Sequence, residues 1–301
     1  MTWFKSKKTV AVHDSNFHPD DVFAVALLSV LYDSKIKVNR TRDEKIIASA
    51  DFVLDVGCVY DPEKNRFDHH QAGGAGLRAN KIAYSSFGLL WKKYGAQVCE
   101  SEEAANILEK RLVEVVDADD CGFKLSQPTL ADRSPFLITD FVYSLRPTWK
   151  ERGADINKFF FRAVDFAKNI LKREIEVTRD QLEIAKIIKE YYLKSLDKRL
   201  VIIDSPKVSR YEIWNALQDF PEPLFAVYGS EGDWAVVAMR KEKDSFNSRK
   251  LFPANWSGLR DDELVNVTGV IDAVFCLNTP FLVGAKSKEG AIKLAKLALE
   301  N

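Results

Sequence analysis

The chain has 301 residues, of which 46% are hydrophobic and 29% charged, the balance of a globular protein with a sizeable core. Its 44 basic and 44 acidic side chains give a formal net charge of zero. This balance excludes a broad basic surface that binds duplex nucleic acid and is compatible only with a local basic groove. The 4 cysteines are scattered without a CxxC pair, which argues against a disulfide framework or a zinc ribbon.

Neither a targeting segment nor a membrane span is expected. The N-terminus lacks the apolar run of a signal peptide. The longest apolar stretch, residues 22–31, is far shorter than the ~20 residues that cross a bilayer. We therefore expect a cytoplasmic protein without membrane contact.

The first part of the chain alternates between short strands and helices. The β-branched run Thr9–Val12 predicts a strand that ends at His13, and a polar loop then leads to an apolar helix from Asp20 to Leu31. Further elements are expected in chain order at 36–38 (strand), 43–48 (helix) and 52–54 (strand). This alternation predicts a parallel sheet with helices on its faces, and ligands bind at the carboxyl ends of such strands, where His13 and Asp55 fall.

The remaining elements predict an α/β chain in three parts. Helices are expected at 80–94 and 101–116, a proline-containing stretch at 127–149, a charged helix at 155–195, strands at 200–203, 224–228 and 234–239, and an amphipathic helix at 288–299. We expect an N-terminal parallel-sheet domain flanked by helices (1–150), a long helical connector (151–196) and a smaller C-terminal α/β domain with a mixed sheet (197–301). The long helix could pack between the two lobes or against a second copy in a homodimer.

The 4 histidines all lie between positions 13 and 70, as His13 with His18 and as His69 with His70. The aspartates that accompany them along the chain are Asp20, Asp55, Asp117 and Asp120. Imidazoles and carboxylates without a thiolate suit Mn²⁺, with Mg²⁺, Co²⁺, Zn²⁺ or Fe²⁺ as alternatives. So many ligands exceed the needs of one tetrahedral ion and fit two cations ~3.5–4 Å apart that clamp a phosphoryl group. Asp55 is the expected bridging ligand, because a strand end holds it rigidly.

Each of these residues alone has an ordinary explanation. A single histidine is more often a satisfied polar residue than a ligand. Asp20 could be a carboxylate at a helix N-terminus, and Asp117 an exposed charge at a helix end. The combination, with two members at strand ends, favours a metal site.

The same motifs resemble those of the MYG (melanocyte proliferating gene) family in the DHH phosphoesterase superfamily. They are His13…His18-Pro19-Asp20, Asp55, Asp68-His69-His70 and Asp117. Longer strings carry the resemblance over nearly the whole chain: 56–62, 67–71, 85–89, 145–149, 232–234, 246–249, 256–260 and 288–291. The resemblance implies a DHH-type fold for the N-terminal domain and a 3′–5′ exonuclease activity on RNA.

The resemblance also implies roles for individual residues. The implied metal ligands are His13, His18, Asp20, Asp55, His69 and Asp117. Asp68 would orient His69 by a hydrogen bond, and His70 would contact the scissile phosphate or protonate the leaving oxygen. Arg249 and Arg260 would bind substrate phosphates through bidentate contacts, with a surface ion pair as the alternative for each.

The chain departs from the family pattern at three places. His18 stands where the wider superfamily has an aspartate. Residues 277–284 lack the usual histidine and one glycine of a Gly-Gly pair, so Val283 is expected to narrow the approach of a phosphate to the backbone. Arg146 stands where an asparagine is expected.

These observations together predict a metal-dependent phosphoesterase that hydrolyses phosphodiester bonds. The expected activity is that of a 3′–5′ exonuclease on single-stranded RNA or short oligonucleotides, with water activated by two metals. Two alternatives remain open. One is a phosphatase or pyrophosphatase for small phosphate esters or nucleotides, and the other is an inactive nucleotide-binding regulatory protein.

Overall fold

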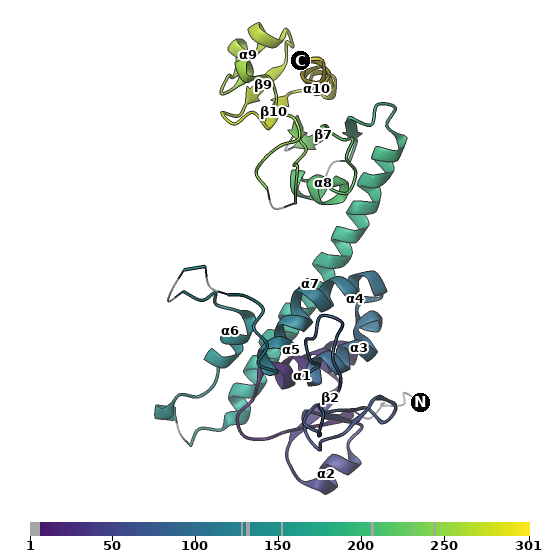
Figure 1. Cartoon of the computed structure of the whole chain (residues 1–301), viewed down its shortest axis with the longest axis vertical. Coiled ribbons are helices and arrows are strands. Elements are labelled where there is room, and N and C mark those ends of the chain that lie inside the picture. The colour runs from purple at the N-terminus through teal and green to yellow at the C-terminus, as the bar shows by residue number, and fades with distance from the viewer. Residues whose placement is uncertain are drawn as a thin grey trace, which may run out of the picture. The chain divides into compact units, whose positions relative to one another are not determined.

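A computed structural model describes residues 7–127, 129–130, 133–151, 153–205, 208–230, 232–243 and 245–301. The chain forms two compact units, Met1–Arg179 and Asp180–Asn301, and the division falls inside the long helix α7, Ile156–Lys194 (Figure 1). The sequence placed the boundary near Leu196, where the composition changes. The packing divides the chain earlier, because Ile188 and Tyr192 of α7 are buried among strands of the second unit.

The first unit contains a five-stranded sheet in the order β2-β1-β3-β5-β4. Its strands are β1 Lys8–Val12, β2 Ile36–Arg40, β3 Phe52–Leu54, β4 Tyr60–Asp61 and β5 Arg66–Phe67. β2, β1, β3 and β5 run parallel, and β4 is an antiparallel edge strand. Residues 10–12 and 52–54 are at most 1% exposed, as expected for parallel strands covered on both faces. The expected parallel sheet is confirmed, with an antiparallel edge that the sequence did not predict.

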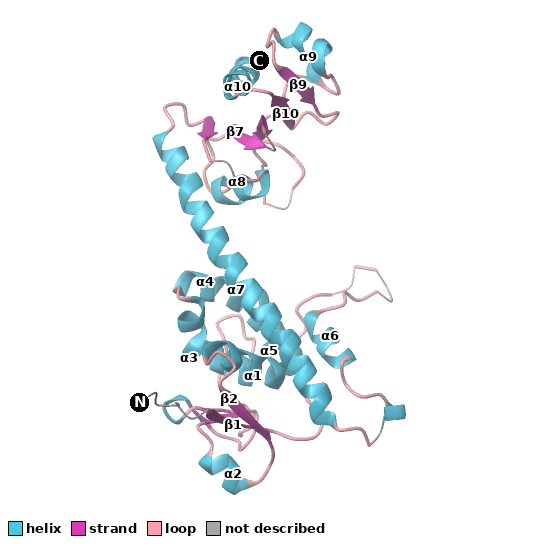
Figure 2. Ribbon diagram, turned by 180° about the vertical axis from the view of Figure 1, so that it is seen from behind, coloured by secondary structure: helices cyan, strands magenta, loops and turns pink. Residues whose placement is uncertain are grey.

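Helices cover both faces of this sheet. The helices of this unit are α1 Pro19–Leu31, α2 Glu44–Ser49, α3 Ser86–Cys99, α4 Glu102–Leu108, α5 Glu114–Asp120 and α6 Ile138–Ser144. Of these, α4, α5 and α6 pack mainly on other helices. Figure 2 shows α1 and α2 on opposite sides of β1 and β2. α1 is buried from Pro19 to Ser29 and packs against α3 and α5. The N-terminus of α1 is therefore held firmly against the sheet.

Two helices differ from their expected ranges. α3 begins at Ser86 rather than near Asn80, because Lys81 has a φ of +69°, which is incompatible with a helix. The helix expected at 101–116 is interrupted by a π-helical turn, Glu109–Val113, and then continues as α5 to Asp120. A π turn inserts one extra residue and so rotates the following residues about the helix axis.

The second unit contains a mixed sheet in the order β6-β7-β8-β10-β9, in which β6 and β7 are parallel and the other pairs antiparallel. Its strands are β6 Leu200–Ile203, β7 Phe225–Ser230, β8 Asp233–Ala238, β9 Ala273–Cys276 and β10 Leu282–Ala285, and its helices after α7 are α8 Arg210–Leu217, α9 Asp261–Thr268 and α10 Lys288–Glu300. Apolar clusters lie on both faces of the sheet. The expected mixed α/β lobe is confirmed.

Three short 3₁₀ helices complete the described elements: Pro62–Lys64, Trp149–Glu151 and Ala254–Trp256. All 4 cysteines are free thiols. No helix in the described part of the chain has both the length and the apolar character of a bilayer span.

Candidate metal centre

The parallel strands bring the predicted residues to one edge of the sheet. His13 follows β1, Asp55 follows β3 and Asp68 follows β5, and these strands point the same way. Asp55 has a φ of +53° and its N–H donates to the Phe67 carbonyl at 3.0 Å, so the backbone turns at this point while it remains tied to β5. The side chains of His13 and Asp55 are 5% and 1% exposed, and the Nε2–Oδ2 distance between them is 3.3 Å.

The N-terminus of α1 adds three more polar residues to this edge. His18 precedes the helix and its N–H donates to Asp21 Oδ1 at 2.9 Å, which fixes the entry into α1. Asp21 Oδ2 lies 2.9 Å from His13 Nε2. Asp20 is fully buried, although a carboxylate in the first helical turn ordinarily faces water. The burial of Asp20 next to other acids indicates a function other than helix capping.

His69 and Asp120 close the cluster from the opposite side. His69 Nε2 lies 3.3 Å from Asp55 Oδ1, 3.3 Å from Asp120 Oδ2 and 3.9 Å from Asp20 Oδ2. Asp120 Oδ1 also lies 4.0 Å from His18 Nδ1. Five of the six residues predicted as ligands therefore converge: His13, His18, Asp20, Asp55 and His69. That all five bind metal stays a prediction.

Asp117 is the exception, because the structure directs it elsewhere. Its carboxylate lies 2.7 Å from a terminal nitrogen of Arg78 and accepts hydrogen bonds from Ser85 Oγ and the Gly88 N–H. Asp117 is fully buried and forms none of the groups that gather around Asp55. The structure therefore does not place Asp117 among the candidate ligands, and the carboxylate of Asp120, one turn later on α5, lies beside His69 instead.

Asp68 also differs from expectation in its partner. It accepts hydrogen bonds from the Cys58 N–H at 2.6 Å and the His70 N–H at 3.1 Å. Its Oδ1 lies 2.8 Å from His70 Nδ1, so Asp68 orients His70 rather than His69. The His70 side chain is 56% exposed and also lies 3.4 Å from Asp55. One carboxylate thus fixes the ring that faces the open side of the site.

Burial and like charges shift the protonation of the cluster. Burial raises the pKa of Asp20 well above its usual value, and the charges of Asp55 and Asp120 add to that rise. Burial works to lower the pKa of His69, but contact with Asp55 and the charge of Asp120 outweigh it and raise the pKa to about 10. Neighbouring carboxylates contribute to both shifts, and a bound cation would neutralise that excess of negative charge.

The donor set fits divalent cations. Several buried atoms have no partner in hydrogen-bond geometry among the described residues: His13 Nε2, Asp20 Oδ1 and Oδ2, Asp21 Oδ2, Asp55 Oδ1 and His69 Nε2. Such atoms are costly to bury unless they bind something. The groups whose ligand atoms lie within 4.8 Å of one another are His13–His18–Asp55, Asp55–His69–His70, His18–Asp20–Asp120 and His69–Asp120–Cys121. His18, Asp55, His69 and Asp120 each belong to two of these groups, so the four groups form one connected cluster.

Binding of Mn²⁺ is expected to release protons. His69, with a pKa of about 10, carries a proton at neutral pH, whereas a ligating imidazole must be neutral. The apparent affinity should therefore rise with pH, by up to about tenfold per unit for each proton displaced, as long as the pH stays below that pKa. Isothermal titration in buffers of different ionisation enthalpy measures the number of protons. An affinity for Mn²⁺ that stays constant between pH 6 and 8 would show that metal binding displaces no proton from His69.

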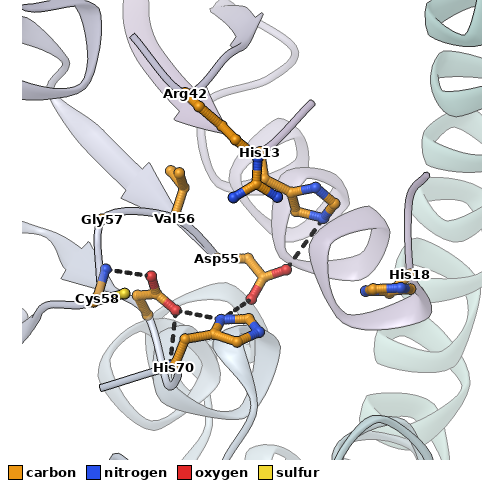
Figure 3. Close-up of a pocket in the computed structure, with 9 residues that line it drawn as sticks. His13, His18, Arg42, Asp55, Val56, Gly57, Cys58 and His70 are labelled. Atoms are coloured by element: carbon orange, nitrogen blue, oxygen red, sulfur yellow. Dashed lines mark hydrogen bonds and ion pairs between the residues drawn. The ribbon is translucent and has the colours of Figure 1, made fainter. Parts of the chain in front are cut away.

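A pocket of about 310 Å³ opens onto this cluster (Figure 3). Its lining consists of His13, His18, Arg42, Asp55, Val56, Gly57, Cys58, Asp68 and His70. Gly57 and Cys58 have φ angles of +91° and +53°, so this wall is a tight backbone turn rather than a layer of side chains. The volume is at the small end of the range for ligand sites and suits a group of roughly nucleotide size.

The two arginines predicted to bind substrate have different surroundings in the second unit. Arg249 donates to four backbone carbonyls: Arg240 at 2.9 Å, Phe220 at 2.5 Å, Pro223 at 3.1 Å and Gln218 at 2.9 Å. Its guanidinium is therefore occupied in holding loops together, and we do not retain the substrate role for it. Arg260 precedes α9, is exposed and lies over the Phe275 ring at 5.9 Å. Its contact with substrate stays a prediction.

Replacing Arg249 with glutamine should destabilise the second unit without a specific effect on substrate binding. The substitution leaves several carbonyls without a donor, at a cost of about 2–3 kcal/mol. Chemical denaturation followed by tryptophan fluorescence measures this loss. Unchanged stability together with a raised KM would instead restore the phosphate-binding role.

The altered 277–284 segment enters the core of the second unit only at its end, where residues 282–284 are buried. Val283 belongs to β10, is fully buried and pairs with Val236 and Cys276 on the neighbouring strands. A Cβ on Gly284 would lie 2.5 Å from the Phe275 ring, so this glycine permits close packing. The sequence suggested that Val283 narrows the approach of a phosphate to the backbone. It does not, because its side chain faces the core.

Arg146, the other departure from the family pattern, supports the loop that carries His18. Its Nε donates to the Phe17 carbonyl at 2.6 Å, and its guanidinium lies 4.4 Å from the centre of the Tyr143 ring. Tyr143 in turn donates to Asp119 at 2.9 Å. These contacts tie α6 both to the start of α1 and to the end of α5.

Comparison with known proteins identifies the family of this chain. The family model MYG1_exonuc, described as an uncharacterised protein family (UPF0160), matches residues 9–299. The MYG1 exonuclease of Homo sapiens is 28% identical over 96% of this chain and 85% of its own length, and a MYG1 protein of Schizosaccharomyces pombe is 28% identical over 97% of both. RecJ from Thermus thermophilus in complex with Mn²⁺ is 11% identical with a TM-score of 0.31, over 98% of this chain and about half (52%) of the RecJ chain. The match over nearly all residues shows that this chain belongs to the MYG1_exonuc family.

Proposed function

We propose that this chain is a metal-dependent phosphodiesterase that removes nucleotides from the 3′ end of RNA or short oligonucleotides. One observation carries the proposal: buried imidazole and carboxylate atoms without hydrogen-bond partners among the described residues converge around Asp55, beside a pocket of nucleotide size. The relative from Homo sapiens is named an exonuclease, which supports nuclease activity. The choice of RNA and the 3′–5′ direction follow from the family resemblance.

Six residues would hold the cations: His13, His18, Asp20, Asp55, His69 and Asp120. Asp55 would bridge two sites, because its two oxygens face different histidines, Oδ2 towards His13 and Oδ1 towards His69. The mixture of imidazole and carboxylate favours Mn²⁺ among the common cations. Divalent cations bound here would neutralise the phosphate charge and acidify water.

His70 is placed to handle a proton on the open side of the site. Asp68 holds its Nδ1 at 2.8 Å, which favours a proton on that nitrogen and sets the plane of the ring. The other ring nitrogen is then available to a phosphate oxygen or a leaving oxygen in the pocket that His70 lines. Replacing Asp68 would remove this orientation while leaving the imidazole in place.

A second candidate is a phosphatase or pyrophosphatase for small phosphate esters. The limited volume of the pocket, about 310 Å³, favours it, because a mononucleotide would fill that space. An inactive nucleotide-binding regulator is less well supported, since retention of so many unpaired buried acids would be costly without a bound cation.

A substrate panel in Mn²⁺ separates these functions. The exonuclease should shorten a 5′-labelled single-stranded RNA by one nucleotide at a time and release nucleoside monophosphates. Matched DNA, a mononucleotide and pyrophosphate serve as competing substrates. Faster turnover of the mononucleotide or of pyrophosphate would favour the phosphatase, and nucleotide binding without any turnover would favour the regulator.

A further inference from the structure

Arg42 is a cation in the pocket that the metal cluster does not use. The described residues lining the pocket are otherwise imidazoles, carboxylates and uncharged groups, so Arg42 carries the permanent positive charge among them. It follows β2 by two residues, at the same edge of the parallel sheet as His13 and Asp55. Figure 3 shows the end of its side chain reaching into the pocket on the side of His13.

The guanidinium is oriented but not consumed by its protein contacts. Its Nε donates to Asp14 Oδ1 at 3.1 Å, in the loop that joins His13 to α1. Neither terminal nitrogen makes a hydrogen bond with the described residues, and the side chain is 65% exposed. Both terminal N–H groups can therefore reach a ligand while Asp14 holds the plane of the group.

Arg40, at the end of the same strand, shows what a structural arginine looks like here. It donates to the Ser15 carbonyl at 2.7 Å and to Asn157 Oδ1 at 3.1 Å, and it lies 4.5 Å from the centre of the Phe160 ring. Its terminal nitrogens are thus engaged in joining the loop to α7. The contrast indicates that Arg42 is placed for something other than packing.

We propose that Arg42 binds a phosphate group of the substrate through its two terminal nitrogens. This inference rests on the proposed function in assigning phosphate esters to the pocket. A planar guanidinium can donate two parallel hydrogen bonds to two phosphate oxygens. Hydrogen bonds in which both partners are charged are among the stronger ones in proteins. The acidic cluster attracts cations and repels an anionic substrate, so a cation on the rim supplies the complementary charge. Arg42 would therefore set affinity for phosphate esters, while the cluster would set affinity for metal.

The test measures phosphate binding and metal binding separately on the whole chain. The variants are Arg42→Gln, which removes the charge, and Arg42→Lys, which keeps a charge without the bidentate geometry. Lys37→Gln is the matched control, since Lys37 is an exposed cation on the same strand and does not line the pocket. Calorimetric titration with Mn²⁺ alone gives metal affinity. Titration of the Mn²⁺-loaded protein with orthophosphate and with uridine 5′-monophosphate gives phosphate affinity.

Arg42→Gln should weaken binding of both phosphates by roughly ten- to a hundredfold, as expected for the loss of a charged hydrogen-bonded contact. Arg42→Lys should fall between this variant and the unmodified chain. Mn²⁺ affinity should stay within about twofold in every variant, as should phosphate affinity in Lys37→Gln. Phosphate affinity that is unchanged in Arg42→Gln would overturn the inference.

The same variants distinguish this inference from the proposed function. If the unmodified chain cleaves RNA and Arg42→Gln does so with the same KM, the function stands and the role of Arg42 is wrong. If the unmodified chain cleaves no oligonucleotide but binds phosphate in an Arg42-dependent manner, the function fails and the role of Arg42 stands.

Discussion

Asp55→Asn is expected to reduce phosphodiester hydrolysis in Mn²⁺ by roughly a hundredfold to ten-thousandfold, because metal-assisted catalysis supplies several kcal/mol of stabilisation to the transition state. Asp55 lies between two imidazoles, with Oδ2 3.3 Å from His13 Nε2 and Oδ1 3.3 Å from His69 Nε2. Asparagine keeps the shape of the side chain but removes the negative charge that a bridging ligand needs.

Asparagine is also the substitution that the backbone tolerates. Asp55 has a φ of +53°, a region in which asparagine is favoured over other residues that carry a Cβ. Alanine at this position would add backbone strain and mix a folding effect with the loss of metal. Asp33 provides a matched control, since it has a φ of +49°, is exposed and pairs with Lys35 at 3.2 Å. Asp33→Asn should retain full activity.

Two measurements show whether the loss in Asp55→Asn arises from metal binding. Mn²⁺ should raise the unfolding temperature of the unmodified chain, because a ligand that binds only the folded state stabilises it, by about 2.7 kcal/mol at a hundred times its Kd. This rise should disappear in Asp55→Asn, while the unfolding temperature in EDTA stays close to that of the unmodified chain. Full hydrolysis together with a normal response to Mn²⁺ would show that Asp55 is not the bridging ligand.

Strand ends were the part of the site that the sequence predicted best. Thr9–Val12 and Phe52–Leu54 are apolar runs that stop at a polar residue, and the alternation with helices indicated a parallel sheet. In such a sheet the carboxyl ends meet at one edge, so the proximity of His13 and Asp55 follows from topology alone. Local pattern and global fold agree here, which is why short-range reasoning was sufficient.

Contacts that depend on helix phase or on distant backbone could not be predicted in this way. Extrapolation of a regular 3.6-residue period gave no sign of the π turn at Glu109–Val113, after which Asp120, rather than Asp117, lies beside His69. The carbonyls that surround Arg249 come from positions 9 to 31 residues away along the chain. A sequence pattern for phosphate binding does not distinguish an arginine whose guanidinium donates to backbone carbonyls from one whose guanidinium is available to a ligand.

The different surroundings of Asp117 and Asp120 on α5 lead to a prediction that separates an effect on stability from an effect on metal binding. Asp117→Ala should destabilise the first unit by roughly 3 kcal/mol, because it leaves Arg78 with its side chain only 5% exposed and without its closest acid. Metal affinity should change little, since Asp117 forms none of the groups around Asp55. Asp120→Ala should instead weaken Mn²⁺ binding and change the stability little. Burial and the charge of Asp55 raise the pKa of Asp120 against the opposing effect of His69, so loss of this carboxylate costs little stability but weakens Mn²⁺ binding.

Urea unfolding in EDTA and calorimetric titration with Mn²⁺ measure the two effects in the same pair of variants. Both substitutions place alanine on the same helix, so differences in helix propensity are matched. The double variant Arg78→Met/Asp117→Leu should recover much of the stability lost in Asp117→Ala, because it replaces a broken ion pair with apolar groups. If Asp117→Ala lost Mn²⁺ binding while its stability was unchanged, and Asp120→Ala bound Mn²⁺ normally, the family pattern would be right about Asp117. The rotation of α5 by the π turn would then not describe the metal-bound protein.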